Sequence, residues 1–472
     1  MTSFTSVIDQ LSQSPHSISD GLLDCPYAQL PPLLSSIDTY LSEQGVQPSD
    51  CIAIECLNSV PSAALLLFML SKRRGFVLLP PSENKDGAST LKPAPQFCQY
   101  RLVVKAVAKA NASGWQADLA QVFVIESHNT DPAQRIDSTG KLFLRTSGSM
   151  GAAKIVVHSH ESLLGSARNV IAKYGLDSDD RFTIPVPIFH LYGLGAEFLP
   201  AIALGAAIDL QENTNLLKYL DRERRFQPTV AFVTPNLCEM LLHGRKTPRP
   251  YKVIVVSGQR IKEELFRAFD PLCGSRLINQ YGSSELGPIA ACLPSDDLDT
   301  RATTIGSAMP NVRLRIEDNG DLYCAHPYHF LGYMNEHGQW LSEASDWHRT
   351  GDLAIDNAGA IAVVGRADAS INRSGYLVLL ADVETRLEQL AYVSQAVVVN
   401  TKAETIQGQL LVACIVLKAA ATVDEAQLRS ESAALLPKYA VPDRVLFLNK
   451  LPLLPSGKTD QQALIALAEQ LS

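Results

Sequence analysis

A stretch of hydroxyl residues, glycines and a lysine, TSGSMGAAK at residues 146–154, carries the first side chains suited to chemistry. Such groups bind phosphate oxygens through hydroxyls, backbone amides and positive charge. The P-loop of nucleotide hydrolases places its lysine directly after a glycine and then opens a helix. Here the lysine comes three residues after Gly151, and the β-branched run IVV that follows is typical of a strand. We therefore predict a phosphate-binding loop of another type, with the candidate ligands Thr146, Ser147, Gly148, Ser149, Gly151 and Lys154.

Four further stretches with nucleotide-binding and metal-binding residue types follow this loop. They are NQYGSSELG (279–287), WHRTGDLA (347–354), VGRADASINRSGYLVLLADVE (364–384) and LPLLPSGKTD (451–460). Each alone is a weak signal, because such short turns occur by chance in many proteins. Together and in this order they closely resemble the adenylate-forming superfamily, which includes acyl-CoA synthetases, nonribosomal-peptide adenylation domains and luciferases. The resemblance covers residue 142 to the C-terminus and the strand–helix pattern before it.

The resemblance implies that a carboxylate is joined to the α-phosphate of ATP with release of pyrophosphate. This step brings two anions together, so the site must supply positive charge, amide donors and a metal ion. In the family pattern, Tyr281 stacks on adenine and Ser284 contacts phosphate. Glu285 would bind Mg²⁺, a hard ion that takes one or two carboxylates beside phosphate oxygens. Asp352 would accept the ribose hydroxyls, with Arg366 as its partner.

The catalytic lysine of the family corresponds to Lys458 in PSGKTD. Only a mobile loop of a small C-terminal domain would deliver a lysine so far along the chain to the ATP site. There it would bridge the substrate carboxylate and the α-phosphate. The phosphate loop departs from the family pattern at Met150 and Ala153, which replace the usual threonine and proline and remove one hydroxyl.

A second half-reaction is implied, in which the acyl group passes to the pantetheine thiol of CoA or of a carrier protein acting in trans. Family members rotate the small domain about a hinge residue, which is Asp368 here. The rotation exchanges the lysine loop for a glycine-containing loop, INRSGY, with Asn372 and Gly375 at the thiol channel. Many relatives carry lysine where Asn372 stands, so this chain lacks that charge.

The stretch FHLYGLGAEF, residues 189–198, is expected to line the acid pocket. His190 resembles the histidine of the carboxylate channel in acyl- and aryl-CoA ligases, with core packing as an open alternative. Amino-acid-activating relatives carry an aspartate in this stretch that pairs with the α-ammonium. Here an aromatic residue and glycines stand instead, so an ammonium would be desolvated and unpaired, which is costly.

Three more positions refine the expected acid. Tyr192 stands where aryl-CoA ligases stack an aromatic ring on the acid. Gly282 stands where acetate-type relatives carry tryptophan, so we expect an open pocket and a shift toward short acids in Gly282→Trp, with the ATP site intact. Gln280 either donates a hydrogen bond to a ring hydroxyl or serves as a buried structural amide. We predict an uncharged aryl or medium-length acyl carboxylate, with the pocket residues His190, Tyr192, Gly258, Gln280 and Gly282.

Apolar strand-like runs alternate with helical patterns between residues 51 and 282, for example CIAIECL, GFVLLP and YKVIVVSG. This alternation predicts βαβ units in an α/β fold with mainly parallel sheets, whose ligands bind at the carboxyl ends of the strands. Short strands and turns over residues 305–364 predict a β subdomain. After residue 365 the pattern becomes that of a small α+β domain. We expect an N-terminal adenylate-forming domain, residues 1–366, and a mobile C-terminal domain, residues 367–472.

The composition is that of an ordinary globular enzyme. The 472 residues are 46% hydrophobic and 19% charged. A net charge of −8 without a basic cluster argues against nucleic-acid binding. Nine scattered cysteines without a C-x-x-C pair indicate the reduced thiols of the cytosol. With neither a secretory signal nor an apolar run long enough to span a bilayer, we expect a cytoplasmic protein without a membrane span.

Two function classes compete for this chain. One is an acid–thiol ligase, an acyl-CoA or acyl-carrier-protein synthetase. The other is a non-catalytic member that binds nucleotide or acyl groups as a regulatory module. The presence of Glu285, Asp352, Arg366 and Lys458 favours catalysis, because a binding module needs neither a metal ligand nor the lysine. An adenylating enzyme whose acceptor is an amine or water also stays open.

Overall fold

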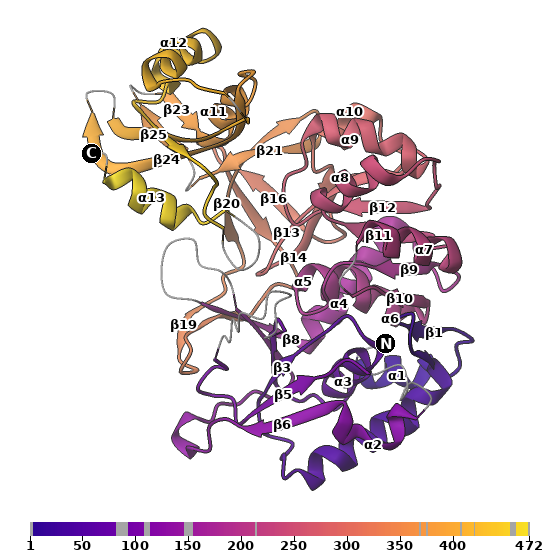
Figure 1. Ribbon diagram of the computed structural model, residues 1–472. Coiled ribbons are helices and arrows are strands. Elements are labelled where there is room, and N and C mark those ends of the chain that lie inside the picture. The colour runs from indigo at the N-terminus through magenta and orange to yellow at the C-terminus, as the bar shows by residue number, and fades with distance from the viewer. Residues whose placement is uncertain are drawn as a thin grey trace.

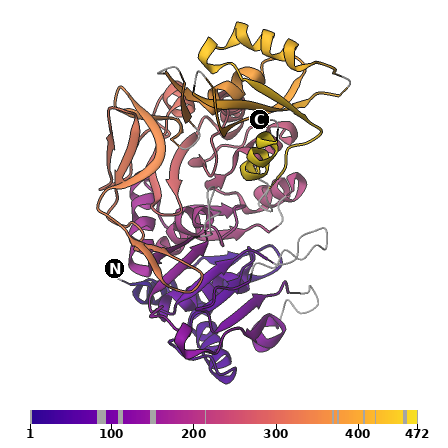
Figure 2. The same cartoon turned by 90° about the vertical axis from the view of Figure 1, so that its left-hand side faces the viewer.

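The computed structural model describes residues 3–81, 93–107, 114–145, 154–212, 215–367, 370–373, 376–405, 408–419, 421–453 and 459–470. The chain forms a large N-terminal α/β domain and a smaller C-terminal domain, which confirms the predicted fold class (Figure 1). The C-terminal elements lie at one end of the molecule and the strands β3, β5 and β6 at the other (Figures 1 and 2). The large sheets are mixed, with parallel centres and antiparallel edges, and pairing in the nine-stranded sheet is mainly parallel, as predicted.

A nine-stranded sheet in the order β15-β14-β13-β12-β11-β9-β10-β1-β2 carries most strands predicted in the second half of the N-terminal domain. Pairing is parallel from β13 through to β1 and antiparallel at both edges. The carboxyl ends of the parallel strands therefore meet along one edge. The strands are β1 (Ser17–Ser19), β2 (Asp24–Pro26), β9 (Arg181–Ile184), β10 (Ala207–Leu210), β11 (Val230–Val233), β12 (Val253–Val256), β13 (Leu277–Ser283), β14 (Gly287–Ala291) and β15 (Ser307–Ala308).

An eight-stranded sheet in the order β19-β18-β8-β7-β4-β3-β5-β6 contains the strands before and after the predicted phosphate loop. The strand predicted after the loop is β8, which pairs antiparallel with β7, Arg145 opposite Ile155. Residues 146–154 therefore connect two strands of a hairpin, and no helix follows the lysine directly. Sequence patterns did not reveal β5, β6 and β7. The strands are β3 (Ile52–Glu55), β4 (Phe76–Leu79), β5 (Tyr100–Val104), β6 (Phe123–Ser127), β7 (Lys141–Arg145), β8 (Ile155–Ser159), β18 (Gly332–Met334) and β19 (Trp340–Glu343).

The helices of the N-terminal domain pack on these sheets. Helix α3 is apolar all round and almost wholly buried, and it begins at a serine cap, with Ser59 accepting from the Ser62 amide. Helix α4 has a Ser159 cap and ends at Gly175 in the left-handed region. The helices are α1 (Phe4–Leu11), α2 (Leu30–Glu43), α3 (Val60–Ser71), α4 (His160–Tyr174), α5 (Leu191–Gly193), α6 (Leu199–Leu204), α7 (Leu216–Phe226), α8 (Pro235–Gly244), α9 (Glu263–Phe269) and α10 (Leu298–Thr303).

The predicted β subdomain is a four-stranded antiparallel sheet, β16 (Arg313–Ile316), β17 (Asp321–Ala325), β20 (His348–Asn357) and β21 (Ala360–Arg366). Strands β18 and β19 come from the same stretch of chain but extend the eight-stranded sheet instead, because β18 pairs with β8. The small sheet therefore contributes residues 352 and 366, and the hairpin β18–β19 lies beside β8.

The C-terminal domain has apolar clusters of its own, formed by buried residues between Ile371 and Ala468. None of the helices within the described ranges has the length and apolar character needed to cross a bilayer. The elements of this domain are β22 (Ser370–Arg373), β23 (Tyr376–Leu379), α11 (Leu380–Leu387), β24 (Val393–Thr405), β25 (Gly408–Leu417), α12 (Glu425–Leu435), β26 (Arg444–Leu448) and α13 (Gln461–Glu469).

A buried charge in α7 gives a test of the N-terminal core. Glu223 is 4% exposed and accepts hydrogen bonds from Arg245, at 2.5 Å, and from the Tyr251 hydroxyl. Removing one partner leaves the other charge buried, so Glu223→Ala should lower the free energy of unfolding by about 3–5 kcal/mol. Asp221 in the same helix pairs with the exposed side chains of Arg224 and Arg225, so Asp221→Ala should cost less than about 1 kcal/mol. Urea unfolding of the two variants measures both values, and equal losses would contradict the expectation.

Candidate active site

The predicted acid-side residues lie at the carboxyl edge of the nine-stranded sheet. His190 is the N-cap of α5 and its side chain is exposed, with its ring against Phe189. The Tyr192 hydroxyl donates to the carbonyl oxygens of Val233 and Val255, at 3.0 and 3.1 Å. Gly258 follows β12 with φ +86°, and a Cβ there would lie 3.8 Å from the Tyr192 ring. The structure therefore brings Tyr192 and Gly258 together and fixes the tyrosine ring.

A π-helical segment, residues 194–198, follows α5 and holds a buried carboxyl group that the sequence patterns did not single out. Glu197 is fully buried, and its Oε1 accepts the Phe232 amide at 2.9 Å. Burial raises the pKa of Glu197 well above its ordinary value. Burial in this segment therefore disfavours the charged form of the carboxyl group.

Gln280 and Tyr281 are neighbours on β13 and so point to opposite faces of the sheet. Gln280 is 6% exposed, and its Oε1 accepts a hydrogen bond from the Tyr174 hydroxyl at 2.7 Å. This contact favours the structural amide, one of the two roles expected from the sequence. A direct contact of Gln280 with the acid stays a prediction.

Gly282 has less room than the sequence led us to expect. A Cβ at this position would lie 2.5 Å from the carbonyl oxygen of Gly287, which is backbone of the paired strand β14. Backbone cannot yield as a flexible side chain does, so Gly282→Trp must displace the turn that carries Glu285. The expectation that this variant leaves the ATP site intact is therefore wrong, because the hairpin itself requires a glycine.

The phosphate side gathers three residues that are distant in sequence. Lys154 places its Nζ 5.2 Å from the ring centre of Tyr333, and the Tyr333 hydroxyl donates to Glu285 Oε1 at 2.9 Å. Tyr333 reaches this place because β18 pairs with β8. No local pattern marked Tyr333, since its role depends on that pairing alone. Arg145 stands at the other end of the loop and binds Glu336, with Nε 2.8 Å from Oε1.

Two neutral histidines support the turn that carries Glu285. The carbonyl oxygens of Ser284 and Pro288 lie 2.7 and 3.1 Å from the Nε2 atoms of His158 and His326. His326 Nδ1 accepts the Tyr328 amide, so its Nε2 carries the proton. Burial lowers the pKa of both histidines to about 4. The turn is therefore fixed from both sides at neutral pH.

The burial of His158 and His326 predicts that the free energy of unfolding falls at acid pH. Because the folded pKa of about 4 lies below the ordinary 6.5, the unfolded chain binds more protons between these values. Stability is then full above pH 6.5 and lost as the pH falls toward 4, by about 3 kcal/mol for each histidine. Urea unfolding from pH 7.5 to 4.5 measures the slope. His158→Gln should flatten it, whereas replacing the exposed His243 should not, and an unchanged slope in His158→Gln would contradict this account.

The ribose-side residues come together across β20, β21 and β13. Asp352 and Arg366 face each other in the β20–β21 pairing, and Asp352 Oδ1 lies 3.4 Å from Arg366 Nη1. The Tyr281 hydroxyl donates to Asp352 Oδ2. Burial, and secondly the Asp352 charge, raise the pKa of Tyr281 above its ordinary value, so the hydroxyl stays a donor. Asp352 is 8% exposed, with its carboxylate fixed between these two partners.

For the remaining predicted site residues, the structure gives only the exposure of Ser284 and the backbone position of Asn372. Ser284 is exposed in the turn that also holds Glu285. The backbone of Asn372 lies in β22, opposite Leu377. The other predicted residues fall outside the described residues, so their roles stay predictions; they are Thr146, Ser147, Gly148, Ser149, Gly151, Asp368, Gly375 and Lys458.

Comparison with known families matches two models to the chain, the AMP-binding enzyme model over residues 84–334 and its C-terminal domain model over residues 382–458. The first match covers more than half of the chain. The protein belongs to the AMP-binding enzyme family, and the resemblance to the adenylate-forming superfamily is confirmed.

Relatives and solved structures agree with this assignment. The indoleacetate–CoA ligase of Aromatoleum aromaticum is 26% identical over 92% of this chain and 91% of its own length. The 2-succinylbenzoate–CoA ligase of Listeria monocytogenes is 27% identical over 68% of each chain. The o-succinylbenzoate CoA synthetase of Bacillus subtilis, in complex with its acyl-adenylate, superposes with a TM-score of 0.79 at 20% identity over 98% of each chain. ATP-bound MatB of Rhodopseudomonas palustris gives 0.78 at 19% identity over 99% of each chain. These structural likenesses show the fold.

Proposed function

We propose that the protein is an ATP-dependent acid–thiol ligase. It would activate a carboxylic acid as acyl-AMP with release of pyrophosphate and transfer the acyl group to the pantetheine thiol of CoA or of a carrier protein. One observation carries the proposal: two carboxylates flank the end of β13. Asp352 is tied to Tyr281 within this strand, and Glu285 follows the strand beside Lys154 and Tyr333. This arrangement suits one nucleotide, with its ribose at Asp352 and its phosphates at Glu285.

Glu285 fits the ligand set of a Mg²⁺ ion bound to nucleotide. Its Oε1 accepts the Tyr333 hydroxyl, and within the described ranges no three His, Cys, Asp or Glu side chains gather into a metal cage. Mg²⁺ usually takes one or two carboxylates and fills its other positions with phosphate oxygens and waters. When bound, the ion would neutralise charge on the phosphates as the α-phosphate is attacked. Tyr333 would keep the carboxylate in place, and Lys154 would hold a phosphate oxygen.

The acid side supports an uncharged aromatic or medium-length acyl carboxylate. The Tyr192 ring is fixed by two hydrogen bonds and lies next to Gly258, so it offers a rigid wall to a flat ring. Burial disfavours the charged form of Glu197, so this carboxyl group is poorly suited to pair with the ammonium of an amino acid. The two relatives described above are named for indoleacetate and 2-succinylbenzoate, which are acids with aromatic rings.

The boundary between the two domains would lie between residues 366 and 367. The two half-reactions would use two orientations of the C-terminal domain about this boundary. Strand β21 ends at Arg366, β22 begins at Ser370, and the apolar clusters between Ile371 and Ala468 are separate from those of the N-terminal domain. Asp368 would be the hinge, and Asn372 and Gly375 would line the thiol channel. A cytoplasmic location is part of this proposal, supported by nine cysteines that are free and buried.

The decisive experiment is acid-dependent exchange of pyrophosphate into ATP across a panel of aryl, alkyl and amino acids, followed by mass detection of the thioester with CoA and with a holo-carrier protein. Exchange with aryl or medium-length acids and a thioester product are expected. ATP binding without exchange on any acid would favour the regulatory module. An adenylate that reacts with amines or water but not with thiols would favour the other acceptor class.

Tyr192→Ala tests the aromatic wall. Loss of the ring should lower kcat/KM for aryl acids by at least about tenfold, because stacking and buried area are both lost, while the KM for ATP stays unchanged. Tyr192→Phe is the matched control, since it keeps the ring and loses only the bonds to Val233 and Val255. Steady-state kinetics on benzoate-like and hexanoate-like acids measure the effect. An equal loss on both classes of acid would remove Tyr192 from acid selection.

A further inference from the structure

The segment that carries His190 makes one backbone hydrogen bond within itself, from the His190 amide to the carbonyl oxygen of Pro187 at 3.1 Å, and its other bonds come from outside. Residues 185–190 connect β9 to α5, and Pro185 and Pro187 lack the N–H groups that would extend the strand. The remaining polar groups of a buried backbone need partners elsewhere. The side chain of Asn58 provides them, because its Oδ1 accepts from the Ile188 amide at 2.8 Å and its Nδ2 donates to Val186 O at 2.9 Å.

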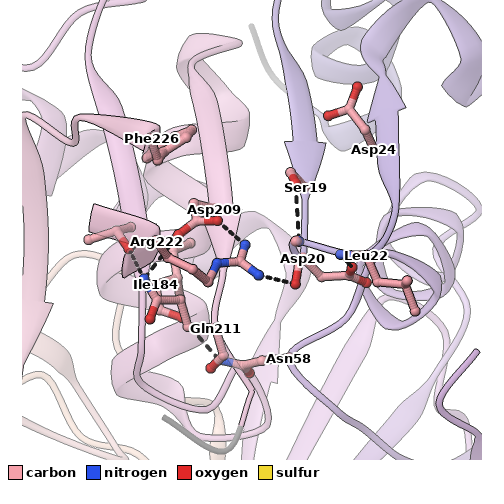
Figure 3. A network of polar contacts seen from close by, with 12 residues as sticks. Ser19, Asp20, Leu22, Asp24, Asn58, Ile184, Asp209, Gln211, Arg222 and Phe226 are labelled. Carbon is pink, nitrogen blue, oxygen red and sulfur yellow. Dashed lines mark hydrogen bonds and ion pairs between the residues drawn. The ribbon is translucent and has the colours of Figure 1, made fainter. Parts of the chain in front are cut away.

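The same amide also joins this segment to two strand ends. Asn58 Nδ2 lies 3.2 Å from Ile184 O, the last residue of β9, and 3.3 Å from Gln211 O, directly after β10. Asn58 is 5% exposed, and Figure 3 shows it next to Gln211. Donor and acceptor in one fixed plane are properties of an amide, and a carboxylate or hydroxyl cannot supply both in this geometry.

A polar network holds Asn58 in its turn. Gln211 Nε2 donates to Thr183 Oγ1 at 2.7 Å and to Asp209 Oδ2 at 3.0 Å. Arg222 pairs with Asp209 and donates to the carbonyl oxygen of Asp20, as Figure 3 shows.

The network also reaches the helix that follows Asn58. Asp20 Oδ2 accepts the amide of Val60, the first residue of α3, at 2.9 Å. Asn58 stands two residues before that helix, so its position is fixed from both the strand side and the helix side.

We propose that Asn58 is a positioning residue for His190. It holds residues 186–188 so that the exposed imidazole stays at the carboxyl edge, close to Tyr192 and the incoming carboxylate. The inference rests on the proposed function, which assigns His190 to the acid. It goes beyond that function by placing a residue more than 130 positions upstream in the control of acid activation.

Two substitutions separate the parts of the contact. Asn58→Ala removes both the donor and the acceptor. Asn58→Asp keeps the acceptor for Ile188 N–H but turns an oxygen toward the carbonyls of Val186, Ile184 and Gln211. Each should lower kcat/KM for the acid by about 10–100-fold, since a small misplacement distant from the reacting atoms has effects of this size. The KM for ATP should change by less than about twofold, because the ATP-side residues lie on other elements.

Thr183→Val is the matched control. Thr183 is fully buried in the same network, where its hydroxyl bonds to Gln211 and Asp209, but within the described residues this hydroxyl makes no hydrogen bond to residues 186–188. It should lose stability without a comparable loss of kcat/KM. Equal kinetic losses in the threonine and asparagine variants, at equal loss of stability, would overturn the proposal.

A double-mutant cycle tests whether Asn58 acts through His190. In a His190→Ala background, Asn58→Ala should lower kcat/KM for the acid by less than about twofold, because the group being positioned is already absent. Full multiplicative losses in both backgrounds would overturn the proposal.

Amide hydrogen exchange gives a readout that needs no substrate. The peptide covering residues 185–190 should exchange faster in both Asn58 variants than in wild type or Thr183→Val. Unchanged exchange would overturn the anchoring by Asn58, whichever acid the enzyme uses. Absence of acid-dependent pyrophosphate exchange in the wild type would instead overturn the proposed function and leave the hydrogen-exchange result to stand on its own.

Discussion

Replacement of Lys458 by alanine is expected to slow acid-dependent pyrophosphate release by at least about 10²–10³-fold, the value of one charge contact made in the transition state. The lysine would bridge the carboxylate and the α-phosphate as both approach. The residues on either side of its loop, Leu453 and Thr459, pair in an antiparallel bridge. Single-turnover adenylation with radiolabelled ATP measures the effect, and Lys450→Ala, an exposed lysine of the same domain, is the control.

The second half-reaction makes this prediction specific. Preformed acyl-adenylate should react with thiol at nearly the wild-type rate in Lys458→Ala, because the lysine loop would have left the site by then. A simple folding defect would slow both steps. If both half-reactions fall equally, the two orientations of the C-terminal domain are not part of the mechanism.

The second large effect is expected for Glu285→Gln. The amide keeps the size and one acceptor oxygen but removes the charge that would hold Mg²⁺ beside the phosphates. Adenylation should fall by about 10²–10³-fold, with a higher Mg²⁺ concentration needed for half-maximal rate. Rates measured over a Mg²⁺ titration at saturating acid test both expectations. Loss of rate at an unchanged Mg²⁺ requirement would remove Glu285 from the metal site.

Two further variants serve as comparisons for the loss of rate in Glu285→Gln. Tyr333→Phe removes only the hydroxyl that donates to Glu285 Oε1, so it should lower the rate by about tenfold, the value of one hydrogen bond to a charged group. Glu343→Gln changes an exposed carboxylate on β19 and should have no effect. A Tyr333→Phe variant as impaired as Glu285→Gln would mean that the tyrosine hydroxyl itself contacts the phosphates.

The strands and helices that frame the site were largely readable from local patterns. Strands β3, β4, β11 and β12 are continuous apolar runs because both faces of a parallel sheet are buried. The run IVV after Lys154 predicted a strand, and β8 confirms it. Strands β5 and β6 were missed although each contains a short apolar run, LVV at 102–104 and FVI at 123–125, because runs this short do not by themselves distinguish a strand from other structure.

Motif order predicted the family and the candidate ligands, because each ligand keeps its own short sequence context. The spacing of these residues along the chain did not predict which of their side chains contact one another. Tyr281 meets Asp352 through a side-chain hydrogen bond between strands of two different sheets, β13 and β20, and Tyr333 meets Lys154 and Glu285 because β18 pairs with β8.

By itself, then, the sequence determined the alternation of strands and helices, and it predicted a phosphate loop of a non-hydrolase type and a set of catalytic candidates. These features depend on residues a few positions apart, where periodicity and turn chemistry act directly. Only the tertiary structure decided that Gly282 has no space for a Cβ, that Gln280 binds Tyr174, and that Asn58 holds the segment before His190. Each of these depends on backbone or side chains brought close by sheet pairing across many residues, and no local pattern encodes such a neighbour.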